Sequence, residues 1–84
     1  MIYRIVPPLR KNKKYSVLVL HNGEWKYLLS FGQLPYQHYK DTTPLRLWSE
    51  LDHHDKERRK RYYERHGHTD DMTSAKYFSN KYLW

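Results

Sequence analysis

Histidines, carboxylates and arginines are concentrated in one short segment, Asp52–His68, which reads DHHDKERRKRYYERHGH. It holds four of the six histidines and six of the sixteen Lys and Arg residues of the chain. Imidazole and carboxylate groups are zinc ligands, whereas guanidinium groups bind phosphate, so both metal and nucleic-acid chemistry are open to this segment. The alternative is a charged helix that serves only the fold.

Helical geometry argues against a single metal site in this segment. Two of its histidines would lie at the start of the helix and two at or just beyond its end, about 20 Å away at a rise of roughly 1.5 Å per residue. One ion cannot bridge that distance, and each end alone offers too few ligands. We therefore expect neither a metal nor a cofactor, with a zinc site completed by His38 or His21 as the alternative.

A helical wheel separates the remaining side chains of the segment into two groups. The inward group contains the residues expected to be structural, which are Asp55, Arg59, Tyr62 and His66. Tyr62 should face the core and thereby shelter an ion pair between Asp55 and Arg59. The outward group could contact successive phosphates, and its candidates for binding nucleic acid are Arg58, Lys60, Arg61 and Arg65. An ordinary solvated face, balanced by Glu57 and Glu64, explains the outward group equally well.

A second basic cluster lies near the N-terminus, in the predicted turn "RKNKK" at 10–14. Flexible cations on a turn can follow a phosphate backbone. The candidates for this second contact are Arg10, Lys11, Lys13 and Lys14. The competing interpretation is a turn that its lysines merely keep soluble.

The segments before position 33 predict the sheet that must support these clusters. Residues 2–6, 15–20 and 25–31 are rich in β-branched, aromatic and aliphatic residues, and Asn22-Gly23 between the last two predicts a two-residue hairpin turn. In the resulting register Leu20 faces Trp25, Leu18 faces Tyr27 and Ser16 faces Leu29. We expect a β-meander over 1–32, followed by an ordered loop at 33–41.

The second half predicts helices. Thr43-Pro44 and the spacing of the apolar residues after it indicate a short helix over 44–51. Asp52 is the expected cap of a second helix over 53–66, which Gly67 ends. A third helical pattern falls within 70–84, with Thr73 or Ser74 as its cap. We therefore predict an α+β fold for a single domain, 1–84, in which a three-stranded antiparallel sheet packs against two or three C-terminal helices in the helical part, 43–84.

Composition limits the classes of function. The chain has 84 residues, a net charge of +7 and a pI near 9.7, which favour acidic partners such as nucleic acid. It has no cysteine, no Gly-rich phosphate loop and no recognisable nucleophile motif, so we do not expect an enzyme. The longest apolar run, Val17–Leu20, is too short to span a bilayer, and the N-terminus lacks the pattern of a signal peptide. We expect an intracellular protein that has no membrane partner.

Three further elements occur in order along the chain: SFGQLPYQHY at 30–39, an HxDxxRRxxYxxRH pattern starting at His53, and SAKYFSNKYLW at 74–84. Together they resemble a group of small uncharacterised basic proteins encoded by large double-stranded DNA viruses of algae and protists. The stretch PLRLWSEL at 44–51 departs from that pattern and looks like an insertion. The resemblance implies a viral origin and presence in infected cells or virions, but no established activity.

These observations lead to one expected function and one alternative. We expect a small, non-catalytic viral accessory protein that binds nucleic acid through its phosphates, with double-stranded DNA as the leading candidate. It would act in the nucleus or cytoplasm of the infected host cell, or in the virion. The alternative is a structural or interaction module of a virion or other assembly, joined to itself or to other virion proteins through its sheet.

Overall fold

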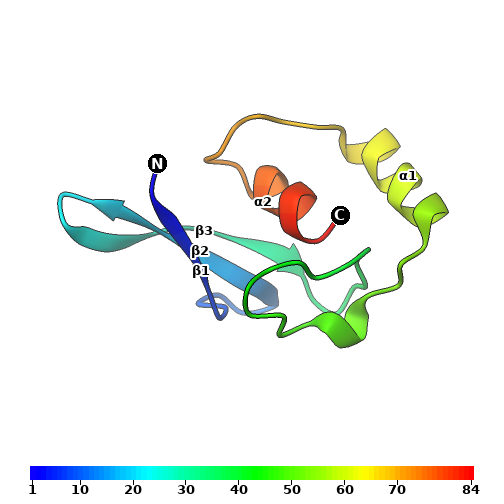
Figure 1. The fold of residues 1–84 in the computed structure, drawn as a ribbon, viewed down its shortest axis with the longest axis horizontal. Coiled ribbons are helices and arrows are strands. Elements are labelled where there is room, and N and C mark those ends of the chain that lie inside the picture. The colour runs from blue at the N-terminus through cyan, green and yellow to red at the C-terminus, as the bar shows by residue number, and fades with distance from the viewer.

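The N-terminal half forms a three-stranded antiparallel sheet in the computed structural model, which describes residues 1–84. The strands are β1 (Tyr3–Val6), β2 (Lys13–His21) and β3 (Glu24–Gln33), and they lie in the order β1-β2-β3 (Figure 1). The chain continues into a 3₁₀ turn, η1 (Ser49–Leu51), and two helices, α1 (Lys56–His66) and α2 (Ala75–Tyr82). The predicted α+β class, with a three-stranded sheet and C-terminal helices, is confirmed.

The β2–β3 hairpin follows the predicted register near its turn and departs from it further along. Asn22 and Gly23 both have positive φ, 50° and 78°, as the tight turn requires. Leu20 pairs with Trp25 and Leu18 with Tyr27, as predicted. A bulge between Val17 and Leu18 then shifts the register, so that Ser16 faces Ser30 and not Leu29. An extra residue in one strand causes such a shift. The alternation of apolar and polar residues in the sequence does not predict it.

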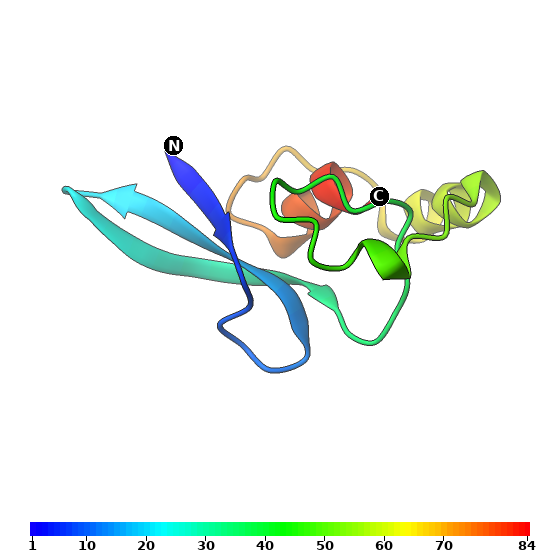
Figure 2. The same ribbon diagram turned by 60° about the horizontal axis from the view of Figure 1, so that its bottom comes forward.

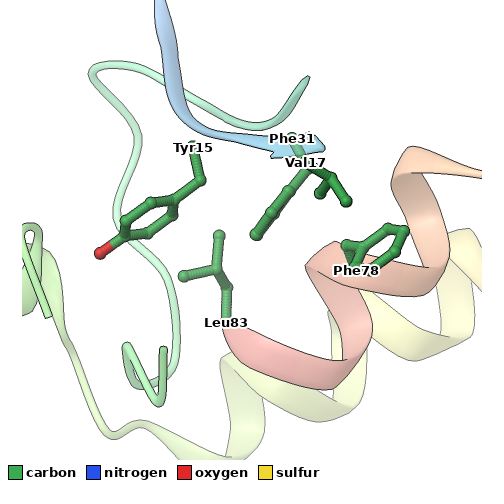
Figure 3. Close-up of a cluster of buried hydrophobic side chains, with 5 residues drawn as sticks. All are labelled: Tyr15, Val17, Phe31, Phe78 and Leu83. Carbon is green, nitrogen blue, oxygen red and sulfur yellow. The ribbon is translucent and has the colours of Figure 1, made fainter. Parts of the chain in front are cut away.

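The core lies between one face of the sheet and α2. Its fully buried members come from β2, β3, α2 and the residue after α2, and they are Tyr15, Val17, Phe31, Phe78 and Leu83 (Figure 3). The bulge matters here, because it aligns Tyr15 opposite Phe31 on this face. The ring of Phe31 stacks on that of Phe78 with centroids 5.8 Å apart. The predicted C-terminal helix and its Ser74 cap are confirmed, since the Ser74 side chain accepts a hydrogen bond from the Lys76 amide.

The helix predicted over 44–51 is wrong except for the 3₁₀ turn at its end. Arg46 has a φ of 49°, in the left-handed region that interrupts a right-handed helix. The Thr43 hydroxyl accepts a hydrogen bond from the Arg46 amide, and the Asp41 carboxylate accepts one from the Trp48 amide. These side chains give the backbone an alternative to helical hydrogen bonding.

The predicted start of the next helix is also wrong, although Gly67 ends that helix as predicted. Helix α1 begins at Lys56, and its cap is Asp55, whose side chain accepts hydrogen bonds from the amides of Glu57 and Arg58. His54 has a φ of 54°, which is incompatible with a helix running through it. Asp52, the predicted cap, is directed to a different set of partners described below.

The elements are spread along an elongated molecule with principal extents of 43 × 25 × 20 Å. The hairpin tip and α1 lie at opposite ends, with α2 between them over the sheet (Figure 1). The loop that follows β3 runs past the end of α2 (Figure 2), where the amides of Lys40 and Thr42 donate to the carbonyls of Leu83 and Tyr82. Helix α1 lies beyond the sheet, and most of its residues are exposed (Figure 1).

Candidate nucleic-acid interface

Helix α1 is attached to the rest of the molecule by its tyrosines. The ring of Tyr62 stacks on Trp84 with centroids 4.2 Å apart and planes within 3° of parallel. The Tyr62 hydroxyl donates to Asn80 Oδ1 at 2.7 Å, and the Tyr63 hydroxyl donates to the Asn80 carbonyl at 3.1 Å. An aromatic pair of this kind contributes about 1 kcal/mol beyond the area it buries. One side of α1 is therefore fixed against the C-terminal end of α2, and the opposite side is free.

The outward arginines gather as predicted around one shallow pocket. Its lining consists of Arg58, Arg61, Tyr62, Glu64, Arg65 and Trp84. Arg61 and Arg65 are exposed, as is the neighbouring Lys60. Arg58 is half-buried, because its Nη1 donates to Gln37 Oε1 at 2.8 Å. The pocket thus combines three guanidinium groups with one carboxylate, that of Glu64, and two aromatic side chains.

The four residues expected to be structural behave differently from one another. Tyr62 is buried, and His66, although exposed, lies against it with ring centroids 4.6 Å apart. The predicted ion pair between Asp55 and Arg59 does not form. The Asp55 carboxylate caps the helix instead, and the backbone hydrogen bonds from Arg58 and Glu57 hold the pKa of this carboxyl below its usual value. Arg59 donates from Nε to the Trp84 carbonyl.

The second basic cluster is divided by the structure. Arg10 and Lys11 are exposed in the turn between β1 and β2, where the Arg10 guanidinium lies 4.2 Å from the centre of the Tyr27 ring. Lys13 begins β2, and its ammonium donates to Gln33 Oε1 at 3.0 Å. Lys13 and Lys14 both line a cleft together with Arg65 of α1, so members of the two predicted clusters meet there. Arg10 and Lys11 do not line that cleft.

Lys14 is not a phosphate contact, which corrects the prediction from the sequence. It lies within β2, its side chain is 2% exposed, and its Nζ is 2.9 Å from His38 Nδ1. Burial lowers the pKa of Lys14 to about 8, although Asp41 and Asp52 act in the opposite direction. An ammonium that is enclosed in this way cannot follow a phosphate backbone.

Lys14 is the first member of a buried polar junction that the sequence did not reveal. His38 Nε2 lies 2.6 Å from Asp52 Oδ1, which also accepts a hydrogen bond from the Asp41 amide at 2.8 Å. An ammonium cannot accept a hydrogen bond, so Lys14 donates to Nδ1 and the proton of neutral His38 resides on Nε2. Burial, followed by the charge of Lys14, lowers the pKa of His38. The junction fastens β2 to the loop after β3.

Asp41 completes this junction on its other side. Its carboxylate accepts hydrogen bonds from the Tyr15 hydroxyl, from the amide and hydroxyl of Thr43, and from the Trp48 amide. Burial would raise the pKa of Asp41, but the hydrogen bonds from Thr43 and Tyr15 outweigh it and leave that pKa lowered. Burial and the same carboxylate raise the pKa of Tyr15 to about 12. The Asp-x-Thr sequence at 41–43 is typical of a side-chain turn and was the one local signal of this arrangement.

The histidines do not converge on a metal. The chain contains no group of three or more His, Cys, Asp or Glu side chains arranged to hold an ion. His38, considered above as a distant ligand, instead bonds Lys14 and Asp52. His53 and His68 pack on Trp84 and Tyr63, respectively.

Comparisons with known proteins do not assign the chain to a family. No protein-family model, no curated protein and no solved structure matches the chain. Neither α1 nor α2 has the length and apolar character needed to cross a membrane.

Proposed function

We propose that this protein binds nucleic acid through the phosphate backbone, with α1 as the main contact. The observation that carries the proposal is that none of its sixteen Lys and Arg side chains forms an ion pair with an Asp or Glu. The salt bridges of the chain join Asp52 to His38 and His54. Glu57 and Glu64 therefore do not pair with the arginines of α1. The positive charge of those arginines is available to an anionic partner.

The spacing of the cations also suits a phosphate strand. Arg58, Arg61 and Arg65 follow one another at single turns of α1, or about 5 Å along its axis. Exposed guanidiniums make charge-assisted and often bidentate hydrogen bonds to phosphate oxygens. With Lys60 and Lys13, about five phosphate contacts are available, which predicts a log–log salt slope near −4.5 on duplex and near −3.5 on single strands.

The test is a salt-titrated binding assay on duplex and single-stranded probes. Arg61→Glu combined with Arg65→Glu should lower affinity at least about tenfold near 50 mM salt and make the salt slope shallower. Lys26→Glu combined with Lys40→Glu is the matched control, because it changes the net charge equally at exposed positions outside the site. A parent protein that binds neither probe, or binds both independently of salt, would contradict the proposal.

The biological setting of the proposal rests on the resemblance of residues 30–84 to proteins of large DNA viruses. It supports the proposal of a non-catalytic viral accessory protein that acts in the infected host cell or in the virion. The prediction is that the protein accumulates during infection together with viral nucleic acid, which fractionation of infected cells would measure.

A second candidate function, self-association within an assembly, is favoured by a separate observation. Apolar side chains are exposed at the hairpin end of the molecule, and they are Met1, Ile2, Leu20, Trp25 and Tyr27. Exposed apolar groups of this size often mark protein contacts. Light scattering distinguishes the two candidates, because a stable oligomer without affinity for nucleic acid supports assembly alone.

A further inference from the structure

An open cleft of about 350 Å³ lies where α1, α2 and the end of β3 approach one another. Phe31 and Leu83 line it, as do the aromatic rings of Tyr36 and Trp84. Its charged lining residues are all basic: Lys13, Lys14, Arg65 and Lys76, without any Asp or Glu. Lys14 is occupied with His38, which leaves three cations at the edges of a partly aromatic hollow. A cleft of this kind suits a ligand that is flat and apolar in one part and anionic in another.

Tyr36 offers the most accessible ring of this cleft. Its side chain lies in the loop after β3, is 68% exposed and makes no hydrogen bond within the molecule. Large aromatic rings more often reduce their exposure by packing, so an unpacked ring beside a cationic cleft can serve as a stacking surface. Nucleobases stack on aromatic side chains at about 1–3 kcal/mol per base, with little dependence on sequence.

The cations of this cleft come from three different elements of the fold. Lys13 and Lys76 extend from β2 and α2, whereas Arg65 belongs to α1. Arg65 also lines the arginine pocket of α1, and Tyr62 and Trp84 are shared by the two hollows. A strand with one base in the cleft could therefore keep one flanking phosphate beside Lys13 or Lys76 and another beside Arg61 and Arg65.

We propose that this cleft binds an unpaired nucleobase, so that the nucleic acid recognised is single-stranded and not duplex. The inference rests on the proposed function and specifies its ligand. It departs from the expectation of double-stranded DNA, because the faces of bases in a duplex are hidden within the stack and cannot reach Tyr36. Arg61 and Arg65 hold the strand, and the cleft distinguishes a single strand from a duplex.

The experiment compares a short single-stranded oligonucleotide with the same sequence as a duplex, at equal salt, by fluorescence anisotropy. Tyr36→Leu should weaken binding of the single strand by about 5- to 100-fold and change duplex binding less than about twofold. Trp25→Leu is the control, because it removes an exposed ring at the hairpin end of the molecule. An abasic strand, which keeps the phosphates, should bind the parent protein as weakly as the intact strand binds the variant.

Each other outcome is decisive. If Tyr36→Leu leaves single-strand affinity unchanged, or if the abasic strand binds as well as the intact one, the base site is overturned while phosphate binding stands. Equal losses on single strand and duplex also overturn it. If the parent protein binds no probe, both the base site and the proposed function fail. A mononucleotide that competes at the concentration of the strand would show that the cleft takes the nucleotide itself and not a strand, which also overturns the inference.

Discussion

The buried junction around His38 and the exposed face of α1 are built from the same kinds of charged residue and have opposite properties. In the junction, His38 forms hydrogen bonds with both Lys14 and Asp52, and all three side chains are at most 10% exposed. On α1, Arg61 and Arg65 are exposed and pair with no carboxylate. A buried charge must be neutralised within the fold, whereas a solvated charge is free to meet a partner. Environment, and not residue type, thus separates the structural charges from those that can bind.

The largest effect on stability should come from removing the Asp41 carboxylate of the junction. Asp41→Ala leaves the Tyr15 hydroxyl and the amides of Thr43 and Trp48 without their acceptor. We expect the free energy of unfolding to fall by about 3–5 kcal/mol, a large part of the stability of a small domain. Urea denaturation measures this loss, and Asp41→Asn, which keeps an acceptor oxygen, should lose less. A loss below about 1 kcal/mol for Asp41→Ala would show that the junction is not structural.

Acidification should weaken the junction by a smaller amount and leave α1 charged. The pKa of His38 is lowered in the folded protein by burial and by Lys14, so the unfolded chain takes up this proton at a higher pH than the folded one. The stability that depends on neutral His38 is therefore fully present at pH values above 6.5, the ordinary pKa of histidine. It falls as the pH drops below that value. Lys14, with a pKa of about 8, remains protonated in this range, and Asp41 and Asp52 also face His38.

Urea midpoints between pH 8 and pH 5 test this dependence. The burial of His53 lowers its pKa too, and this acts in the same direction. His21→Gln, at the exposed end of β2, is the control and should keep the loss of stability on acidification. A midpoint that stays constant, or rises, on acidification would mean that His38 is not held neutral.

The sequence predicted those features that depend on neighbouring residues. Asn22-Gly23 specifies its turn through backbone conformation alone, and Ser74 and Gly67 act on the amides and carbonyls next to them. The burial of Lys14 depends on His38, and the loss of the Asp52 cap depends on the same histidine, from a loop with no periodicity. Long-range partners of polar residues leave no local pattern. This is why the arginine face of α1 could be placed from its helical spacing, while the junction and the Tyr36 cleft could not.

The smallest effect on the free energy of unfolding should come from removing charge on α1. This change also gives the sharpest contrast between the two regions. Arg61→Gln combined with Arg65→Gln removes two exposed cations that make no hydrogen bond and no ion pair in the folded protein. We expect the free energy of unfolding to stay within about 0.5 kcal/mol of the parent, as for most exposed positions. Lys14→Gln removes a single positive charge, but from the junction, and should cost at least about 2 kcal/mol because the shorter side chain leaves the buried Nδ1 of His38 without its donor. Urea denaturation measures both variants. If they lose the same free energy of unfolding, burial does not separate the structural charges of this chain from the exposed ones.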